Sequence, residues 1–178
     1  MRYEFDFSNE VSLVTGAGRG IGLAISNELS NLGSTVALMA RSPEELHVAS
    51  KTIKAKGGKA ESFVCDVSDL ESVKHNIKEI ENKLGPIKYL VNNAGVTGAT
   101  GRDWEVDPVR WWRTMEVNLK GAFNCSHIVL KGMIGRRQGR IVNVSSSSAE
   151  LIIPFMSSYG VSKAALTHLT TSSAEAAR

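Results

Sequence analysis

The sequence predicts an α/β fold with a doubly wound parallel sheet, and three observations lead to this prediction. Continuous apolar runs such as Val11–Thr15 are typical of strands that are buried on both faces. Longer stretches with apolar residues at helical spacing separate these runs. Strands that alternate with helices form right-handed βαβ units. A chain of 178 residues can bury a substantial core, so we expect a single domain over residues 1–178.

The other elements follow from the same patterns and from residues that start or stop helices. Further strands are expected at residues 35–39, 60–65, 87–91 and 140–144. Gly33 ends the first helix, Ser42-Pro43 starts the second, and a capping box from Ser68 to Glu71 starts the third. Asp107-Pro108 opens a long helix that reaches about residue 134. The final helix begins near Ser157 and has no strand after it, so we expect a fold truncated in its C-terminal part.

Composition and charge exclude several classes of function. The net charge of +3 is too small and too evenly spread to predict nucleic-acid binding. No apolar run is long enough to cross a bilayer, and the first residues lack the apolar core of a secretory signal. Cys65 and Cys125 stand outside any metal-binding or redox motif, so we expect no metal and two buried free thiols. These observations predict a cytoplasmic protein.

A glycine-rich segment joins the first strand to the first helix: Thr15-Gly16-Ala17-Gly18-Arg19-Gly20-Ile21-Gly22. Such a turn lets the backbone approach a pyrophosphate closely, and the N–H groups and dipole of the helix N-terminus attract phosphate. The spacing differs from the usual Gly-x-Gly-x-x-Gly, and a purely structural tight turn is the alternative. The position between a buried strand and a helix favours dinucleotide binding on a Rossmann-type sheet, a three-layer αβα sandwich.

The sequence resembles the short-chain dehydrogenase/reductase family through five motifs in that family's order and spacing. These are Thr15-Gly16-x-x-x-Gly20-x-Gly22, Asn92-Asn93-Ala94-Gly95 after the fourth strand, Asn118 within Met-Glu-Val-Asn-Leu-Lys-Gly, Ser146, and Tyr159-Gly-Val-Ser-Lys163. The resemblance spans the whole chain and is to the non-extended, NADP(H)-preferring type. It implies an oxidoreductase that transfers a hydride between the cofactor and a carbonyl or secondary alcohol.

The resemblance also implies a role for each catalytic candidate. Tyr159 and Lys163 are four residues apart and share one face of a helix. A phenol has a pKa of about 10, and a nearby ammonium favours its ionised form. Tyr159 is therefore implied as the general acid/base, with Lys163 tuning it and bonding the nicotinamide ribose. Ser146 is implied to bond the substrate, and Asn118 to hold a proton-relaying water. The alternative for Tyr159, Lys163 and Asn118 is a place on a solvated helix face.

Four consecutive serines, residues 145–148, make the choice of the catalytic serine less direct. The family spacing selects Ser146. Because side chains alternate along a strand end, Ser148 is expected to face the site together with Ser146 as a substrate contact. A hydroxyl that belongs to a turn is the equal alternative for Ser148.

The end of the second strand predicts a preference for NADP(H) over NAD(H). NAD-selective sites place a carboxylate there, whereas this sequence has Ala40 followed by Arg41. Arg41 and Arg19 would attract the 2′-phosphate, and two solvated surface arginines are the alternative. Asp66-Val67 resembles the pair that bonds the adenine, although Asp66 could instead cap the following turn. The full set of implied cofactor-binding residues is Thr15, Gly16, Gly18, Arg19, Gly20, Ile21, Gly22, Arg41, Asp66, Val67, Asn93, Ala94, Gly95, Tyr159 and Lys163.

The substrate is less well defined by the sequence. The apolar residues of segment 150–156 (Leu151, Ile152, Ile153 and Phe155) form a substrate-pocket wall or belong to the core. A narrower interpretation is a 3-oxoacyl-[acyl-carrier-protein] reductase, in which Arg136-Arg137 docks the acidic carrier; these cations could equally stabilise a helix end. A non-catalytic cofactor-binding or scaffold protein is the third hypothesis. The resemblance further implies a homodimer or homotetramer formed through the Asn118 and Tyr159 helices.

Overall fold

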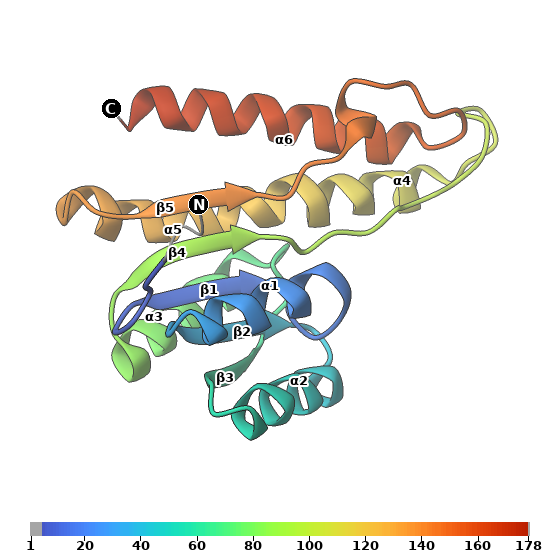
Figure 1. Ribbon diagram of the computed structural model, residues 1–178. Coiled ribbons are helices and arrows are strands. Elements are labelled where there is room, and N and C mark those ends of the chain that lie inside the picture. The colour runs from blue at the N-terminus through green and yellow to red at the C-terminus, as the bar shows by residue number, and fades with distance from the viewer. Residues whose placement is uncertain (1–4, 178) are drawn as a thin grey trace.

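The computed structural model describes residues 5–177 and contains a five-stranded parallel sheet in the order β3-β2-β1-β4-β5 (Figure 1). The strands are β1 (Val11–Thr15), β2 (Thr35–Ala40), β3 (Lys59–Val64), β4 (Ile87–Asn92) and β5 (Arg140–Asn143). This order and direction confirm the predicted doubly wound α/β fold. The register is continuous between β1 and β2, where Val11 pairs with Thr35 and Thr15 pairs with Met39.

Helices connect the strands: α1 (Gly20–Asn31), α2 (Pro43–Ala55), α3 (Leu70–Leu84), α4 (Pro108–Met115), α5 (Gly121–Gly135) and α6 (Ser157–Ala176). Two predicted helix starts are confirmed, because Ser42 Oγ accepts a hydrogen bond from Glu45 N and Asp107 Oδ1 accepts one from Val109 N. The third is wrong by one residue. Asp69, not Ser68, caps α3, because Ser68 is bonded to Asp66 in the preceding turn.

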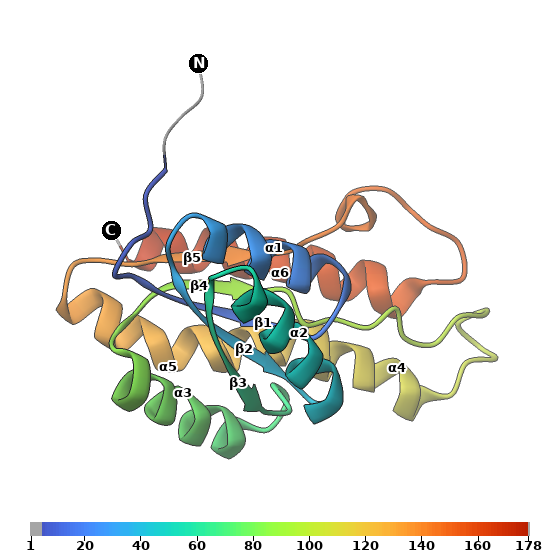
Figure 2. The ribbon, with the colours of Figure 1, turned by 60° about the horizontal axis from the view of Figure 1, so that its bottom comes forward.

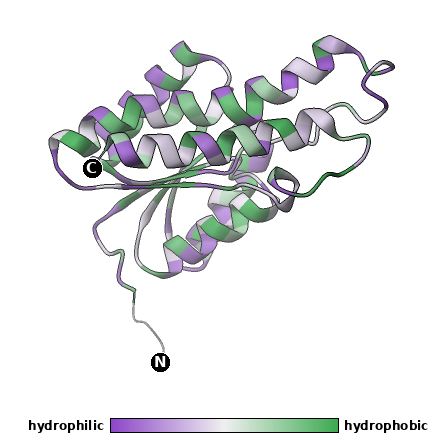
Figure 3. Ribbon diagram, turned by 90° about the horizontal axis from the view of Figure 1, so that it is seen from above, coloured by the Kyte–Doolittle hydropathy of each residue, from purple (hydrophilic) through white to green (hydrophobic). Residues whose placement is uncertain are grey.

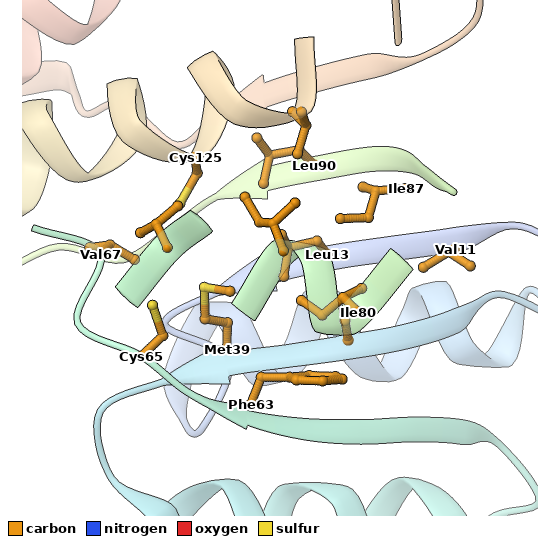
Figure 4. Close-up of a cluster of buried hydrophobic side chains, with 14 of the residues drawn as sticks. Val11, Leu13, Met39, Phe63, Cys65, Val67, Ile80, Ile87, Leu90 and Cys125 are labelled. Atoms are coloured by element: carbon orange, nitrogen blue, oxygen red, sulfur yellow. The ribbon is translucent and has the colours of Figure 1, made fainter. Parts of the chain in front are cut away.

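The sheet has a separate apolar core on each face. Side chains of α1 and α2 pack on one face, against residues such as Val14, Val36 and Leu38. Side chains of α3 and α5 pack on the other face, and Figure 4 shows this second core, with Leu13, Met39 and Ile80 near its centre. Figure 2 shows α3 and α5 together below the sheet. Burial on both faces explains why the central strands β1 and β2 are mostly apolar along their whole length.

The long helix predicted after Asp107 is interrupted. A π-helical turn, η1 (Glu116–Lys120), separates α4 from α5, so the prediction of one continuous α-helix is wrong at its centre. A π-turn inserts an extra residue into the helical ladder, which apolar spacing alone does not reveal, and such turns are frequent at functional sites. Asn118 lies in this turn. Seen from above, α6 lies beside the combined α4–η1–α5 helix, and it packs on α4 and η1 (Figure 3).

Two hollows lie at different places on the fold. The larger, of about 860 Å³, lies beside β5 and between α5 and α6. The smaller, of about 560 Å³, lies where the glycine turn, the ends of β2 and β3 and the segment after β4 meet. Chain connections leave β1 and β4 in opposite directions, which makes this second position the switch point where α/β sheets bind ligands.

Other observations on the described residues concern the cysteines, membrane spans and metal ligands. Cys65 and Cys125 are buried and free, as predicted. Burial raises the pKa of the Cys125 thiol to about 12, so this side chain behaves as a small apolar group. Within residues 5–177, no helix has the length and apolar character needed to span a membrane, and no three metal-ligating side chains gather at one place.

Candidate active site

The glycine turn and the segment after β4 are bonded into one unit by Thr15. Its hydroxyl oxygen accepts hydrogen bonds from the backbone N of Asn93 and of Ala94, both at 3.0 Å. In return, Asn93 Nδ2 donates to the carbonyl oxygens of Thr15 and Gly16 at 2.9 and 3.2 Å. Two motifs that are 77 residues apart at their closest bonded pair are therefore held in fixed contact.

Two glycines of the turn are required by this close approach. Gly16 has a φ of +63°, and a β-carbon there would lie 2.9 Å from the α-carbon of Ala94. A β-carbon on Gly22 would lie 2.2 Å from the carbonyl oxygen of Gly16 and 2.5 Å from Asn93 Nδ2. Larger residues at these two positions would separate the turn from the segment after β4. Steric exclusion therefore explains why both positions are glycine.

Most of the predicted cofactor residues line the cavity of about 560 Å³. These are Gly16, Gly18, Arg19, Gly20, Ile21, Arg41, Asp66, Val67, Asn93, Ala94 and Gly95. Thr15 and Gly22 are buried beneath the turn and act through the contacts described above. Tyr159 and Lys163 are not among the cavity-lining residues. The structure thus brings distant predicted residues to one place.

The end of this cavity near β2 holds an acid that the sequence argument missed. Glu45, on α2, lines the cavity, and its Oε1 lies 3.5 Å from Arg19 Nε. The Arg19 side chain is 84% exposed, so the pair is weak and easily opened. Arg41 is exposed and bonds no described residue. The sequence showed Glu45 only as part of a helix start; its approach to Arg19 depends on how α2 packs.

Asn118 is buried and every hydrogen of its amide is bonded. Its Nδ2 donates to the carbonyl oxygen of Val96 at 3.0 Å and to Ser162 Oγ at 2.9 Å, and its Oδ1 accepts from Val96 N at 2.8 Å. The alternative of a solvated helix face is wrong for this residue, which is only 1% exposed. Its side chain holds the segment after β4 against α6. It therefore fixes the position of that segment relative to Tyr159 and Lys163 on α6.

Lys163 is also buried, and its ammonium lies deep in the site. Nζ donates to the carbonyl oxygen of Val144 at 2.7 Å and lies 5.7 Å from the centre of the Tyr159 ring. Burial lowers the pKa of Lys163 below its ordinary value of 10.5. A solvated surface position is wrong for Lys163, because the residue is only 4% exposed. Two of its three N–H donors remain for other partners.

The cavity of about 560 Å³ and helix α6, which carries Tyr159 and Lys163, meet at Gly95. A β-carbon on Gly95 would lie 3.3 Å from Asn118 Oδ1 and 3.7 Å from Lys163 Nζ. Gly95 lines the cavity, so the buried ammonium lies just beyond its wall. Any side chain at this position would separate the cavity from Lys163.

Lys163 predicts a pH dependence of stability. Because the pKa of Lys163 is lower in the folded chain, the unfolded chain binds more protons between that folded value and 10.5. The free energy of unfolding should gain a rising contribution with pH in this window. We expect Lys163→Met to remove that contribution in urea titrations between pH 7 and 10.5. The exposed Lys131 on α5 supplies the control, since Lys131→Met should keep the parent slope.

The serine run after β5 does not continue as a strand. Ser146 is extended, but Ser147–Ala149 form a 3₁₀ turn, and Ser146 Oγ accepts a hydrogen bond from Ser148 N at 3.2 Å. The alternation of side chains along a strand therefore does not extend to Ser148. The Ser148 hydroxyl is buried and has no hydrogen-bond partner among the described residues. A substrate contact by either serine stays a prediction.

The segment after this turn is exposed, not core. Leu151, Ile152, Ile153 and Phe155 are 42–94% exposed, so the interpretation of these residues as core is wrong. Their segment is fixed at its end, because the carbonyl oxygen of Phe155 accepts from Gly101 N at 2.9 Å. These residues remain available as a pocket wall.

Asp66 and Arg136 each have a structural role in the fold. Asp66 Oδ1 accepts from the N and Oγ of Ser68, so it caps the turn after β3, as the alternative interpretation held. Arg136 Nη2 donates to the carbonyl oxygen of Ile87 at 3.1 Å, which ties the end of α5 to the start of β4. Arg113, which no sequence motif indicated, donates to Asp66 Oδ2. No local signal in α4 marked that contact.

A doubly wound parallel sheet with a glycine turn at its switch point defines an α/β domain of the Rossmann type. A family model described as short chain dehydrogenase matches residues 10–178. The chain belongs to the short-chain dehydrogenase family.

Individual relatives agree with this assignment. The chain is 37% identical to gluconate 5-dehydrogenase of Gluconobacter oxydans (strain 621H) over 166 residues, which are 93% of this chain and 64% of that protein. It is similar to NAD+-bound xylitol dehydrogenase, with a TM-score of 0.93 and 36% identity over 96% of this chain and 66% of that one. It is also similar to a metagenomic short-chain oxidoreductase in complex with NADP, with a TM-score of 0.90 and 37% identity over 95% and 76%. The chain spans about two thirds of the length of the first two proteins.

Proposed function

We propose that this chain forms the cofactor-binding and catalytic part of an NADP(H)-dependent oxidoreductase that acts on a carbonyl or secondary alcohol. The observation that carries this proposal is the meeting of the nucleotide-sized cavity with the buried Lys163 ammonium at Gly95. The family to which the chain belongs, and the dehydrogenase among its relatives, support the same chemistry.

Several features of the cavity support the binding of a dinucleotide. The first residues of α1 have neither a capping side chain nor an acidic residue, so their N–H groups are open to an anion. Gly16 and Gly22 let the turn pack closely on the segment after β4, and a β-carbon on Gly20 would meet no described atom within 4 Å, so the backbone on that side is open to a pyrophosphate. Gly20 and Ile21 would bond the phosphates, and Asn93, Ala94 and Gly95 would line the path to the nicotinamide.

A bound nicotinamide cofactor supplies or accepts the hydride in this chemistry. Tyr159 delivers a proton to the substrate oxygen during reduction, or removes one during oxidation. Lys163, whose ammonium lies 5.7 Å from the centre of the Tyr159 ring, favours the ionised form of that phenol and donates to the ribose. Ser146 donates to the substrate oxygen. Asn118 has both amide hydrogens engaged, so only a lone pair of Oδ1 is free to hold a relay water.

Arg41 supports the preference for NADP(H). It lies at the cavity end near Ala40, is free of described partners and carries the charge that a 2′-phosphate requires. Arg19 would join it after releasing Glu45. The similar solved structures hold NAD+ in one case and NADP in another, so the preference is a property to measure in this chain.

The cofactor test follows the oxidation of NADPH and NADH with a panel of carbonyl substrates. We expect higher kcat/KM with NADPH, and a fall of about a hundredfold in the NADPH/NADH ratio for Ala40→Asp with Arg41→Ser, because a charge-assisted bond is replaced by repulsion. Lys51→Ser, an exposed change on α2 away from the cavity, should leave the ratio unchanged. Equal or better turnover of the parent with NADH would contradict the proposal.

The two other hypotheses predict different results. A scaffold protein would bind the nucleotide and turn over no carbonyl. In a 3-oxoacyl-[acyl-carrier-protein] reductase Arg136-Arg137 would dock the acidic carrier, whereas here Arg136 donates to the carbonyl oxygen of Ile87, so this contact does not favour the narrower function over the broader one.

A further inference from the structure

The first turn of α6 carries Tyr159 and has no capping side chain of its own. Met156, the residue before the helix, makes no capping hydrogen bond with its side chain. The segment that leads into the helix, residues 150–155, is exposed. Because uncapped helix ends open readily, the position of the Tyr159 side chain depends on contacts from outside α6.

Helix α4 and the π-turn η1 supply these contacts, and α4 lies beside the start of α6 (Figure 1). Trp111 Nε1 donates to Ser157 Oγ at 2.9 Å. Seven residues further along, Asn118 Nδ2 donates to Ser162 Oγ, also at 2.9 Å. Ser157 and Ser162 lie on either side of Tyr159 in the sequence, so the two bonds hold the turn that carries the phenol at both of its ends.

The two ends of this turn are held to different extents. Ser162 Oγ donates to the carbonyl oxygen of Tyr159 at 2.8 Å, so the bond from Asn118 is linked directly to the backbone of Tyr159. Lys163 Nζ donates to the carbonyl oxygen of Val144 and fixes the same side of the turn. The N-terminal side depends on Ser157.

The Ser157 hydroxyl is fixed by two partners. It accepts from Trp111 Nε1 and donates to Asp103 Oδ1. Asp103 is exposed, so water competes for its carboxylate, whereas the Trp111 and Ser157 side chains are partly buried. Nearby, Gly101 N donates to the carbonyl oxygen of Phe155 at 2.9 Å. The loop after β4, helix α4 and the start of α6 are therefore joined around Ser157, and Trp111 makes the more protected bond.

We propose that Trp111 is a positioning residue for Tyr159: through Ser157 it holds the first turn of α6, so that the phenol stays within reach of the substrate oxygen. The inference rests on the proposed function for the role of the phenol. Trp111 does not line the cavity of about 560 Å³, so it influences the reaction only through α6.

The first experiment measures turnover of a carbonyl substrate and the affinity for NADPH. Trp111→Phe keeps an aromatic ring and removes the N–H donor. It should lower kcat about tenfold and change the Kd for NADPH less than twofold, because a displacement of about 1 Å can cost up to about a hundredfold in rate. Ser157→Ala should cause the same loss, and the double variant should lose no more than either single variant. Ser157→Thr keeps a hydroxyl and should keep most of the rate.

Trp112→Phe is the matched control. Trp112 is the next residue of α4, is 62% exposed and bonds no described residue through its N–H. Its ring contacts that of Trp111 edge-on, so both variants alter the same pair of rings. Trp112→Phe should keep the kcat of the parent. In a Tyr159→Phe background, Trp111→Phe should have no further effect on the residual rate, because its influence passes through the phenol.

Nuclear magnetic resonance of protein labelled with carbon-13 in its tyrosine rings reports the position of the phenol without any turnover. The chain has three tyrosines, and the signal that is missing in Tyr159→Phe belongs to Tyr159. Trp111→Phe should shift or broaden this signal, and Ser157→Ala, which keeps the indole ring, should do the same. The signal of Tyr89 on β4 should stay unchanged.

An active parent whose kcat is unchanged by Trp111→Phe would overturn the inference. Losses of kcat and of NADPH affinity by the same factor would indicate a general structural role and overturn it too. A parent that reduces no carbonyl would refute the proposed function, and the Tyr159 signal would then decide the inference. A change of that signal in both Trp111→Phe and Ser157→Ala supports it, and an unchanged signal overturns it.

Discussion

Tyr159→Phe should reduce turnover by about a thousandfold, because general acid–base catalysis by one positioned side chain contributes about 10²–10⁴-fold. The change removes the only oxygen of the side chain and keeps the ring, which lies near Lys163 Nζ. The fold and the affinity for NADPH should therefore stay close to those of the parent. Steady-state reduction of a carbonyl substrate, together with NADPH titration, measures both quantities.

Tyr89→Phe supplies the control for this change. Tyr89 lies on β4 and its ring packs edge-on against Phe7, away from the cavity. Loss of this hydroxyl should change turnover by less than a factor of about two, because substitutions away from a functional feature usually have small effects. If Tyr159→Phe kept the turnover of the parent, Tyr159 would not be the general acid/base, and another group would have to transfer the proton.

Asn118→Ala should cost about 3–5 kcal/mol of unfolding free energy, because it leaves the partly buried N–H and carbonyl groups of Val96 without partners and removes the bond that Ser162 Oγ accepts, at about 1–3 kcal/mol each. This is a large part of the stability of a typical domain, which is about 5–15 kcal/mol. Urea unfolding at neutral pH measures the change.

Asn124→Ala is the matched comparison, since Asn124 is an equally buried amide in the same long helix with one bond, to Val67. It should cost about 1–2 kcal/mol. If the two variants lost equal unfolding free energy, the bonds of Asn118 to the segment after β4 and to α6 would not contribute the expected 3–5 kcal/mol, which is about 1–3 kcal/mol for each bond.

Much of the fold could be predicted because its signals are local. Buried strands such as Val11–Thr15 are mostly apolar, and the helix starts at Ser42 and Asp107 carry their capping residues next to the first turn. The predicted start of α3 was wrong by one residue, because two neighbouring residues could each cap the helix. Both Ser68 and Asp69 can cap a helix, and Asp66 decided the outcome by binding Ser68.

The π-turn at Glu116–Lys120 and the 3₁₀ turn at Ser147–Ala149 were not predictable in the same way. Both are single turns whose apolar spacing differs little from that of their neighbours. They matter for the site because one carries Asn118 and the other follows Ser146.

The sequence by itself determined the sheet, the glycine turn and which residues could carry the chemistry, since strand burial, tight turns and the spacing of Tyr159 and Lys163 depend on neighbours along the chain. Only the tertiary structure decided that Asn118 is bonded on all its amide hydrogens, that Glu45 reaches Arg19, and that Arg113 holds Asp66. These contacts join residues tens of positions apart. Their geometry depends on how helices pack on the sheet, and no local pattern records that packing.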